Sequence, residues 1–151
     1  MIPNAVTSQE KLRHPEDYTK MEASFGTMQN SKIDNFKEKF KQRLYNFVLK
    51  LIEFLDNLPK DNVSKRIGDQ LLRSGTSIIG NYIEGQSASS KKEFTNFFTT
   101  SLKSANESKL WLTLLRDTKR AKPEETTWFL SELAEISNIF ASSILTLKGK
   151  K

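Results

Sequence analysis

The sequence has no cysteine and a single histidine, His14, among its 151 residues. Without cysteine the chain can form neither a disulfide nor a thiolate metal site, and a cysteine nucleophile is excluded. His14 precedes Pro15 in a segment without periodicity, where we expect neither a catalytic nor a metal-ligating role. We therefore predict no catalytic residues, no metal and no cofactor. The lack of cysteine also fits a reducing compartment.

Long apolar runs are also missing. No stretch of 18 apolar residues occurs, so no membrane span is predicted. The N-terminus lacks a basic segment followed by an apolar core, so we expect no secretory signal and a cytoplasmic protein. Residues 1–32 mix Pro, Gly, Asn and Ser with scattered charges, which predicts a flexible N-terminal tail. Residues 33–148 are predicted to form one domain.

Within that domain, apolar residues recur at intervals of three and four, and no strand-like alternation occurs. The periodicity predicts four helices, at about residues 34–58, 61–84, 90–119 and 123–147. Because the links between them are short, consecutive helices are expected to be antiparallel neighbours. The predicted fold class is all-α, an antiparallel up-down four-helix bundle.

Residues suited to helix starts support these limits. Asp34 and Asp61 are predicted to cap the first two helices. Ser90 and Glu93 form a predicted capping box for the third helix. Pro123 suits the first position of the fourth helix, because its missing N–H would have no partner there.

Apolar side chains occupy more than one side of the second and third helices. A surface helix has one apolar stripe, and a helix that is apolar on most sides is buried on most sides. A bundle of this length cannot bury such helices all round, so a homo-oligomer is predicted. The expected interface residues are Leu72, Ile79, Ile83, Phe97, Trp111 and Leu114.

Glycines interrupt the second helix at positions 68, 75 and 80, where each costs about 1 kcal/mol relative to alanine. We expect them at places where another backbone approaches closely, and the alternative is that they are tolerated defects. Gly85 lies where the periodicity stops, and it is predicted to be a left-handed C-terminal cap.

Four polar residues on the second and third helices are predicted to form a structural polar core: Arg73, Asn81, Glu84 and Glu107. The alternative is that Glu84 and Glu107 bind a metal or act in acid–base catalysis. A di-iron site needs Glu-x-x-His pairs, which the bundle lacks. The run Gly75–Asn81 has the glycine spacing of a phosphate loop, but it lacks the lysine and the preceding strand, so we reject that interpretation.

The net charge is +6, and residues 89–122 carry eight basic and three acidic side chains. A basic surface can bind nucleic-acid phosphates. The predicted nucleic-acid-binding residues are Lys91, Lys92, Lys103, Lys109, Arg116, Lys119, Arg120 and Lys122. The alternative is a solvated helix surface that is rich in lysine. Trp111 and Trp128 could stack on bases, but aromatic residues at helical spacing are more often part of a core.

Three motifs resemble the four helix bundle protein family, also called the 23S rRNA-intervening sequence protein family. They are the run from Gln70 to Gly85, Ser90-Lys-Lys-Glu-Phe94 and the run from Ser104 to Leu112. The resemblance covers about residues 36–147. It implies an up-down bundle that assembles as a ring, typically a homopentamer. It also implies a structural role, not a catalytic one, for Asn81, Glu84 and Glu107.

Some members of that family are encoded within intervening sequences of large-subunit rRNA genes. A related protein, the accessory variability determinant of diversity-generating retroelements, is a basic pentamer that works with a reverse transcriptase and its RNA. Gln86 departs from members that continue with an acidic or Arg-containing turn. We therefore expect a non-enzymatic homo-oligomer that binds RNA or a nucleoprotein. The alternative is a structural assembly or protein-partner scaffold without a nucleic-acid role.

Overall fold

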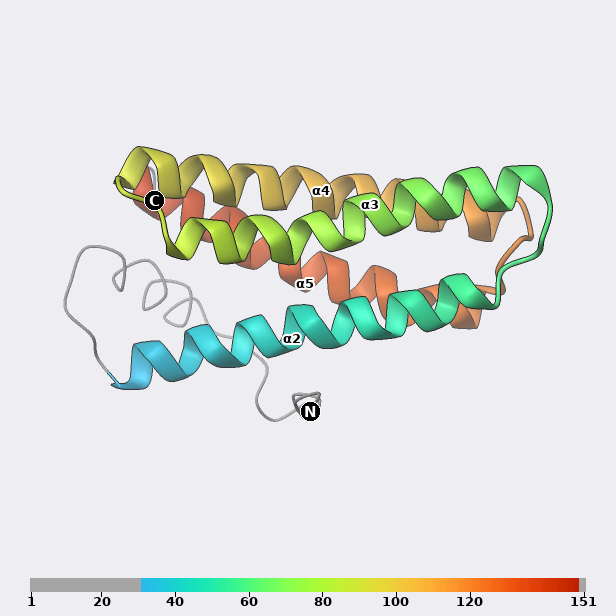
Figure 1. Cartoon of the computed structure of the whole chain (residues 1–151), viewed down its shortest axis with the longest axis horizontal. Helices are drawn as coiled ribbons and strands as arrows, with labels where there is room; N and C mark the ends of the chain where they lie inside the picture. The colour runs from blue at the N-terminus through green and yellow to red at the C-terminus, as the bar shows by residue number, and fades with distance from the viewer. Residues whose placement is uncertain (1–30, 150–151) are drawn as a thin grey trace.

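The computed structural model describes residues 31–149, which form four α-helices and no strand. The helices are labelled as in Figure 1: α2 (Ser31–Asp56), α3 (Asn62–Gln86), α4 (Lys91–Asp117) and α5 (Pro123–Leu147). They run alternately in opposite directions, so the turns after α2 and α4 lie at one end and the turn after α3 lies at the other. The predicted all-α, antiparallel four-helix architecture is confirmed for these residues.

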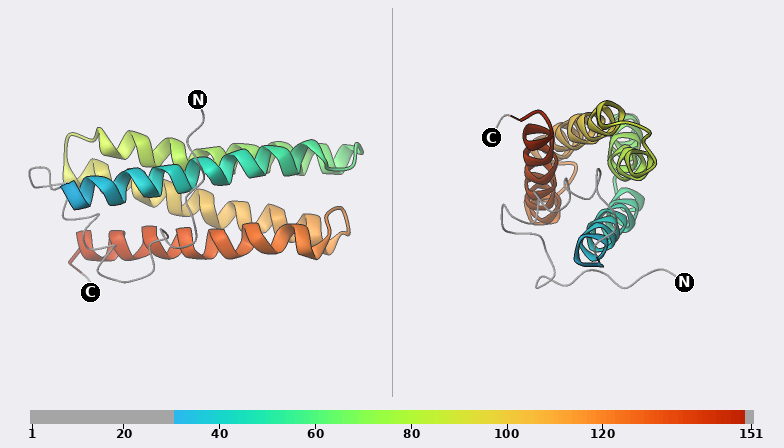
Figure 2. Two further views of the ribbon diagram at one scale, coloured as in Figure 1. Left: turned by 90° about the horizontal axis from the view of Figure 1, so that it is seen from below. Right: turned by 90° about the vertical axis from the view of Figure 1, so that its left-hand side faces the viewer.

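Viewed end-on, the helices follow one another around the bundle axis in chain order, and α2 meets α5 to close it (Figure 2). No helix within residues 31–149 is long and apolar enough to cross a membrane. The predicted tail and His14 lie outside the described residues, apart from the start of α2 at Ser31.

The limits of α2, α3 and α4 differ from the predicted ones by one to three residues, and those of α5 coincide with them. Asp34 lies in the first turn of α2, so the prediction that it caps this helix is wrong. Asp61 caps α3 as predicted: its Oδ1 accepts a 2.9 Å hydrogen bond from the Ser64 N–H. Ser90 caps α4 by accepting a 3.1 Å hydrogen bond from the Glu93 N–H.

Aromatic rings fill much of the core. At one end of the bundle, Phe40 lies edge-on to Tyr82 at 5.1 Å, and Phe98 lies edge-on to Phe140 at the same distance. At the other end, Phe129 packs against Phe54 with ring centroids 5.2 Å apart. Each aromatic pair stabilises the fold by about 0.5–1.5 kcal/mol beyond the area that it buries.

Small residues determine where helices approach one another closely. A Cβ atom built on Gly75 would collide with Cδ2 of Leu51, so a larger residue here would force the buried Leu51 side chain to move where α3 meets α2. Nothing lies within 4 Å of a Cβ built on Gly80, so the predicted close approach does not occur there within the chain. Gly85 is inside α3, which continues to Gln86, so the prediction of a left-handed cap at Gly85 is wrong. Its Cβ would instead lie 3.2 Å from Cβ of Phe97.

Serine hydroxyls line the contact between α3 and α4. Ser74 Oγ lies 2.8 Å from Ser108 Oγ, and Ser104 donates a 2.9 Å hydrogen bond to Ser77 Oγ. Ser101 donates to the carbonyl of Ile78 at 2.9 Å. Because these hydroxyls are small and hydrogen-bonded, α3 and α4 pack closely without leaving these polar atoms unsatisfied.

Candidate functional site

The residues predicted to form a polar core lie at or near the surface of the chain. Arg73 forms an ion pair with Glu107 between α3 and α4, and their side chains are 56% and 33% exposed. Glu107 also accepts a 2.9 Å hydrogen bond from the indole N–H of Trp111. Asn81 is half-buried and donates 2.9 Å hydrogen bonds within its own helix. Glu84 is exposed.

The prediction that Arg73 and Glu84 belong to the core of this chain is therefore wrong. The face of α3 that carries them is directed outward beside α4. Glu107 does accept a hydrogen bond from Arg73, so the pair links the two helices at their outer edge. An exposed pair of this kind contributes at most about 1 kcal/mol.

The buried ion pair of the bundle lies elsewhere, between α2 and α5. Nε and Nη2 of Arg43 donate to the Glu132 carboxylate at 2.8 and 2.9 Å, and both side chains are almost fully buried. Nη2 also lies 3.3 Å from Oε2 of Glu135. Burial by itself would lower the pKa of Arg43. The hydrogen bonds and charges of the two glutamates outweigh burial, so the pKa is raised and the guanidinium stays charged.

Arg43 and Glu132 were not among the residues that the sequence analysis singled out. The available signal was spacing. Arg43 lies three residues after Phe40 and four before Phe47, both of which are buried. Glu132 similarly lies three residues after Phe129 and four before Ile136. A charged residue at a core position of each of two neighbouring helices predicts a buried pair.

The predicted interface residues form two separate groups, one on α3 and one on α4. Leu72, Ile79 and Ile83 are spaced seven and four residues apart, so they share one side of α3. This side is next to α2, since Leu72 lines a pocket together with Leu55. The other three, on α4, are half-buried. The Trp111–Glu107–Arg73 contacts place that second group along the outer edge between α3 and α4.

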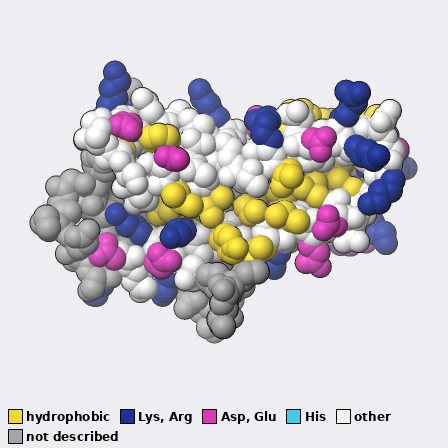
Figure 3. All heavy atoms as spheres, in the orientation of Figure 1, with side chains coloured by type: hydrophobic (Ala, Val, Ile, Leu, Met, Phe, Trp, Pro, Cys, Tyr) yellow, Lys and Arg dark blue, Asp and Glu magenta, His cyan; other side chains and the backbone are white. Residues whose placement is uncertain are grey.

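The side of α3 next to α2 continues onto α2 as an uncovered strip, which we call the apolar band. It consists of Tyr45, Val48, Ile52, Leu55, Leu72, Ile79 and Ile83. Four of these side chains are 38–45% exposed, and the rest are half-buried. Figure 3 shows hydrophobic side chains running along the seam between α2 and α3 on this face. A strip this long is unusual for the surface of a monomeric soluble protein.

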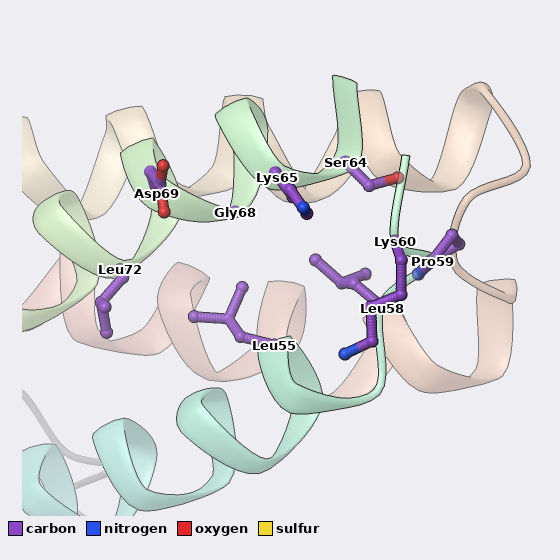
Figure 4. A pocket seen from close by; sticks show the side chains of 9 residues that line it. All are labelled: Leu55, Leu58, Pro59, Lys60, Ser64, Lys65, Gly68, Asp69 and Leu72. Carbon is purple, nitrogen blue, oxygen red and sulfur yellow. The ribbon is translucent and has the colours of Figure 1, made fainter. Parts of the chain in front are cut away.

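A small pocket of about 280 Å³ lies at one end of the apolar band. Leu55 of α2 and Leu58 of the following turn lie on one side of the pocket, and Leu72 of α3 lies on the other (Figure 4). Lys60 and Lys65 also line it. The hydroxyl in its lining, that of Ser64, is engaged in the helix cap, since it donates to Oδ2 of Asp61 at 2.7 Å.

The predicted nucleic-acid-binding residues do not form one surface. Lys91 and Lys92 lie at the start of α4, at the opposite end of the bundle from Lys119. Because α4 has 27 residues and rises 1.5 Å for each, the two ends are about 40 Å apart. Lys103 and Lys109 lie between them along α4. Burial lowers the pKa of Lys109, which donates to Asn106 at 3.3 Å.

The other four predicted cations do meet. They line an open hollow of about 700 Å³ at the end of the bundle that carries the turns after α2 and α4. We call it the end hollow, and its lining residues are Asn57, Pro59, Arg116, Asp117, Lys119, Arg120, Ala121, Lys122, Pro123 and Glu125. Figure 3 shows Lys and Arg side chains gathered at this end.

Each of the two arginines in the end hollow contacts a carboxylate through its Nε atom. Nε of Arg116 lies 2.9 Å from Asp117, and Nε of Arg120 lies 3.4 Å from Asp61. The Ser64 N–H and hydroxyl, followed by Arg120, lower the pKa of Asp61 to about 2. Asp61 therefore keeps its charge down to strongly acidic pH.

Three further observations concern metal binding, a buried hydroxyl and the predicted stacking aromatic. Within residues 31–149, no group of three His, Cys, Asp or Glu side chains lies close enough to hold a metal ion. Burial raises the pKa of Tyr82, whose hydroxyl donates to the carbonyl of Lys37 at 3.3 Å. Trp128 stacks against Phe47 with ring centroids 6.2 Å apart, and the Lys50 ammonium lies 4.2 Å from the Trp128 ring centre. Trp128 is thus a packing residue.

Comparison with known proteins agrees with this architecture. Residues 37–142 match the family model described as 23S rRNA-intervening sequence protein. Among solved structures, a protein of unknown function from the S23 ribosomal protein family of Bacteroides thetaiotaomicron is similar, with 32% sequence identity and a TM-score of 0.64. That match covers 69% of this chain and 96% of the other. No curated protein matches the chain. Because the matched residues make up most of the bundle, the chain belongs to the 23S rRNA-intervening sequence protein family.

Proposed function

We propose that this protein is a non-enzymatic, cytoplasmic, self-associating module that binds RNA. The uncovered apolar band between α2 and α3 is the observation that carries the self-association. Burying one large apolar side chain contributes about 1.5–3 kcal/mol, so covering several half-exposed ones supplies a substantial driving force for association. Most buried polar groups pair within the bundle, as Arg43 does with Glu132 and the serines between α3 and α4 do with one another, which supports a structural role for them. Nη1 of Arg43 is the one buried side-chain polar atom of residues 31–149 without a partner.

A second copy of the chain is the occupant that we propose for the apolar band. The band lies on one flank of α3, and the half-buried Phe97, Trp111 and Leu114 lie beyond its other flank. Two different patches on opposite flanks suit a head-to-tail contact, in which one patch of each copy meets the other patch of the next. Such contacts form a ring when the rotation between copies closes. A pentamer is the size that the family resemblance leads us to propose.

Light scattering tests the self-association. We expect the wild-type protein to have the mass of a multimer at micromolar concentration. Ile83→Glu should yield a folded monomer, because a carboxylate would be buried without a partner in the contact. Leu145→Glu is the matched control, since Leu145 on α5 is 48% exposed and Ile83 is 45% exposed. A monomeric wild type, or an Ile83→Glu protein that keeps the multimeric mass, would contradict the proposal.

The distribution of charge supports RNA as the partner. Residues 89–122 carry most of the excess positive charge, and a ring would repeat that surface in every copy. Binding that rests on phosphate contacts weakens steeply with salt, because each contact releases condensed counterions. A uridine 20-mer in fluorescence anisotropy, measured between 50 and 300 mM salt, should give a log–log slope of several units.

A structural scaffold without a nucleic-acid role predicts different results. The protein would then purify free of nucleic acid, and its mass would not change on ribonuclease treatment. The uridine 20-mer would not bind even at 50 mM salt. Either a flat salt dependence or no binding would reject the RNA-binding proposal while leaving the self-association to the Ile83→Glu test.

A further inference from the structure

The end hollow combines four cations with an unusual backbone conformation. Lys119 has φ = +62°, the left-handed region, and it is the one non-glycine residue within residues 31–149 with a positive φ. Its N–H donates to the carbonyl of Arg116 at 3.0 Å, and the Arg120 N–H donates to that of Leu115 at 2.9 Å. These two bonds form the Schellman motif that ends α4.

Glycine is the residue that this position favours. The Schellman motif places its left-handed residue where a Cβ atom is strained, and glycine avoids that strain. A lysine there carries a cost that the cap itself does not require. Strained residues of this kind gather at functional sites, so the observed outlier points to a use for the lysine side chain.

The arginines of the hollow are also arranged for an anion. Within residues 31–149, Asp117 and Asp61 contact Nε of Arg116 and Arg120, and the terminal NH₂ groups of both arginines keep their donors. The carboxylates thereby hold each guanidinium without occupying its fork. A planar guanidinium fork matches the geometry of two phosphate oxygens. The ammonium groups of Lys119 and Lys122 form no ion pair among the described residues, so they are also open to a ligand. Glu125, which lines the hollow too, accepts a 3.0 Å hydrogen bond from the backbone N–H of Lys122.

Two proline rings complete the hollow. Pro59 comes from the turn after α2, and Pro123 begins α5. Their rings form apolar walls beside the cations. A ribose or a base could pack against these walls while its phosphate contacts the cations. A volume of about 700 Å³ leaves room for one or two nucleotides.

We propose that the end hollow is the place where the protein grips its RNA strand, with Lys119, Lys122 and the open forks of Arg116 and Arg120 on consecutive phosphates. This inference rests on the proposed RNA-binding function and names its site. It also assigns the lysines at the other end of α4, Lys91 and Lys92, to the solvated surface.

The test compares two double substitutions that remove the same charge from the two ends of α4. Lys119→Gln/Lys122→Gln should weaken binding of the uridine 20-mer by about tenfold or more at 100 mM salt. It should also reduce the salt slope by about 1.4, because each phosphate contact of a single strand contributes about 0.7. Lys91→Gln/Lys92→Gln is the control, and its affinity should stay within about twofold of the wild type.

The two proposals fail in different ways. If both double variants lose affinity equally, or if only the control loses it, the strand does not bind at the end hollow, although the protein still binds RNA. If the wild type binds no RNA at 50 mM salt, the site and the function fail together. Lys119→Gly separates a loss of binding from a loss of folding. Its thermal midpoint should rise, while its affinity for the 20-mer should fall. A variant that gains stability and keeps full affinity would overturn the role of Lys119.

Discussion

Arg43 and Glu132 are separated by 89 residues in the sequence and meet in a two-point ion pair inside the bundle, with N–O distances of 2.8 and 2.9 Å. The pair joins α2 to α5, the first and last helices of the bundle. Because both groups are buried, each depends on the other for its charge to be tolerated. The two-point geometry also fixes the register of α2 against α5.

Removing one partner of this pair should be costly. Arg43→Met leaves the Glu132 carboxylate buried without its guanidinium, and we expect a loss of about 3–5 kcal/mol in the free energy of unfolding. Urea denaturation at fixed protein concentration measures it. The double variant Arg43→Met/Glu132→Met should recover most of that loss, because the carboxylate that still lacks its partner, Glu135, is partly exposed to water.

Arg73→Met is the control for this experiment. Its pair with Glu107 is largely exposed, so the loss should be below about 1 kcal/mol. Equal losses for Arg43→Met and Arg73→Met would show that burial does not set the energy of these pairs.

Two glycines of α3 should respond to the same substitution with opposite signs. Gly75→Ala forces the new methyl group against Leu51, so we expect a destabilisation of about 1–3 kcal/mol. Gly80→Ala meets nothing within 4 Å and adds helix propensity, so a gain of about 0.5–1 kcal/mol is expected.

Thermal or urea unfolding of both variants measures the difference. The light-scattering mass of Gly80→Ala adds a second readout. If a neighbouring copy packs against this glycine in the ring, the variant should dissociate more readily at low concentration. A destabilised Gly80→Ala protein with unchanged mass would contradict the open surroundings seen at this position.

Much of the bundle follows from the sequence because helix periodicity is a local property. The spacing of Leu44, Leu51 and Leu58 reports one buried face, and the cap at Asp61 needs residues only three apart. The predicted helix start at Asp34 and helix end at Gly85 were wrong, because the position of a helix end also depends on the packing of neighbouring elements against it. Gly85 remains helical because α3 continues beside Phe97 of α4.

The sites were harder to predict, since periodicity gives a direction around one helix but not the neighbour that it faces. Arg73 and Glu84 were expected inside, and they lie outside because α4 covers a different part of α3. The eight cations were expected to bind nucleic acid, but the length of α4 divides them between its two ends. Lys119 has a special conformation that no pattern in the sequence marks, because the Schellman position usually carries glycine.

Acid should weaken the protein partly through Asp61. Hydrogen bonds from Ser64 and then the charge of Arg120 hold the pKa of Asp61 at about 2, below its ordinary value of 3.8. A carboxylate with a lowered folded-state pKa stabilises the fold above its ordinary pKa and loses that contribution as the pH falls through the folded value. The contribution of Asp61 should therefore disappear between about pH 4 and pH 2.

Asp61→Asn isolates this effect, since asparagine can still cap α3 but carries no charge. Its thermal midpoint should lie below that of the wild type at pH 7, and the two should converge toward pH 2. Comparing the two proteins removes the contribution of the other carboxylates, which titrate in both. Parallel curves across this range would show that Asp61 is not the group responsible.

The strain at Lys119 gives a prediction that is independent of any ligand. A non-glycine residue in the left-handed region costs about 1–2 kcal/mol, so Lys119→Gly should stabilise the bundle by roughly 1 kcal/mol after the greater flexibility of glycine in the unfolded chain is counted. Lys122→Gly removes the same charge three residues later, where φ is −74° and glycine relieves nothing. It should be neutral or slightly destabilising. Urea unfolding of the two variants at low salt, without RNA, separates backbone strain from charge repulsion. A higher free energy of unfolding in both variants would assign the effect to repulsion between the crowded cations. A higher free energy of unfolding in Lys119→Gly alone assigns it to the backbone.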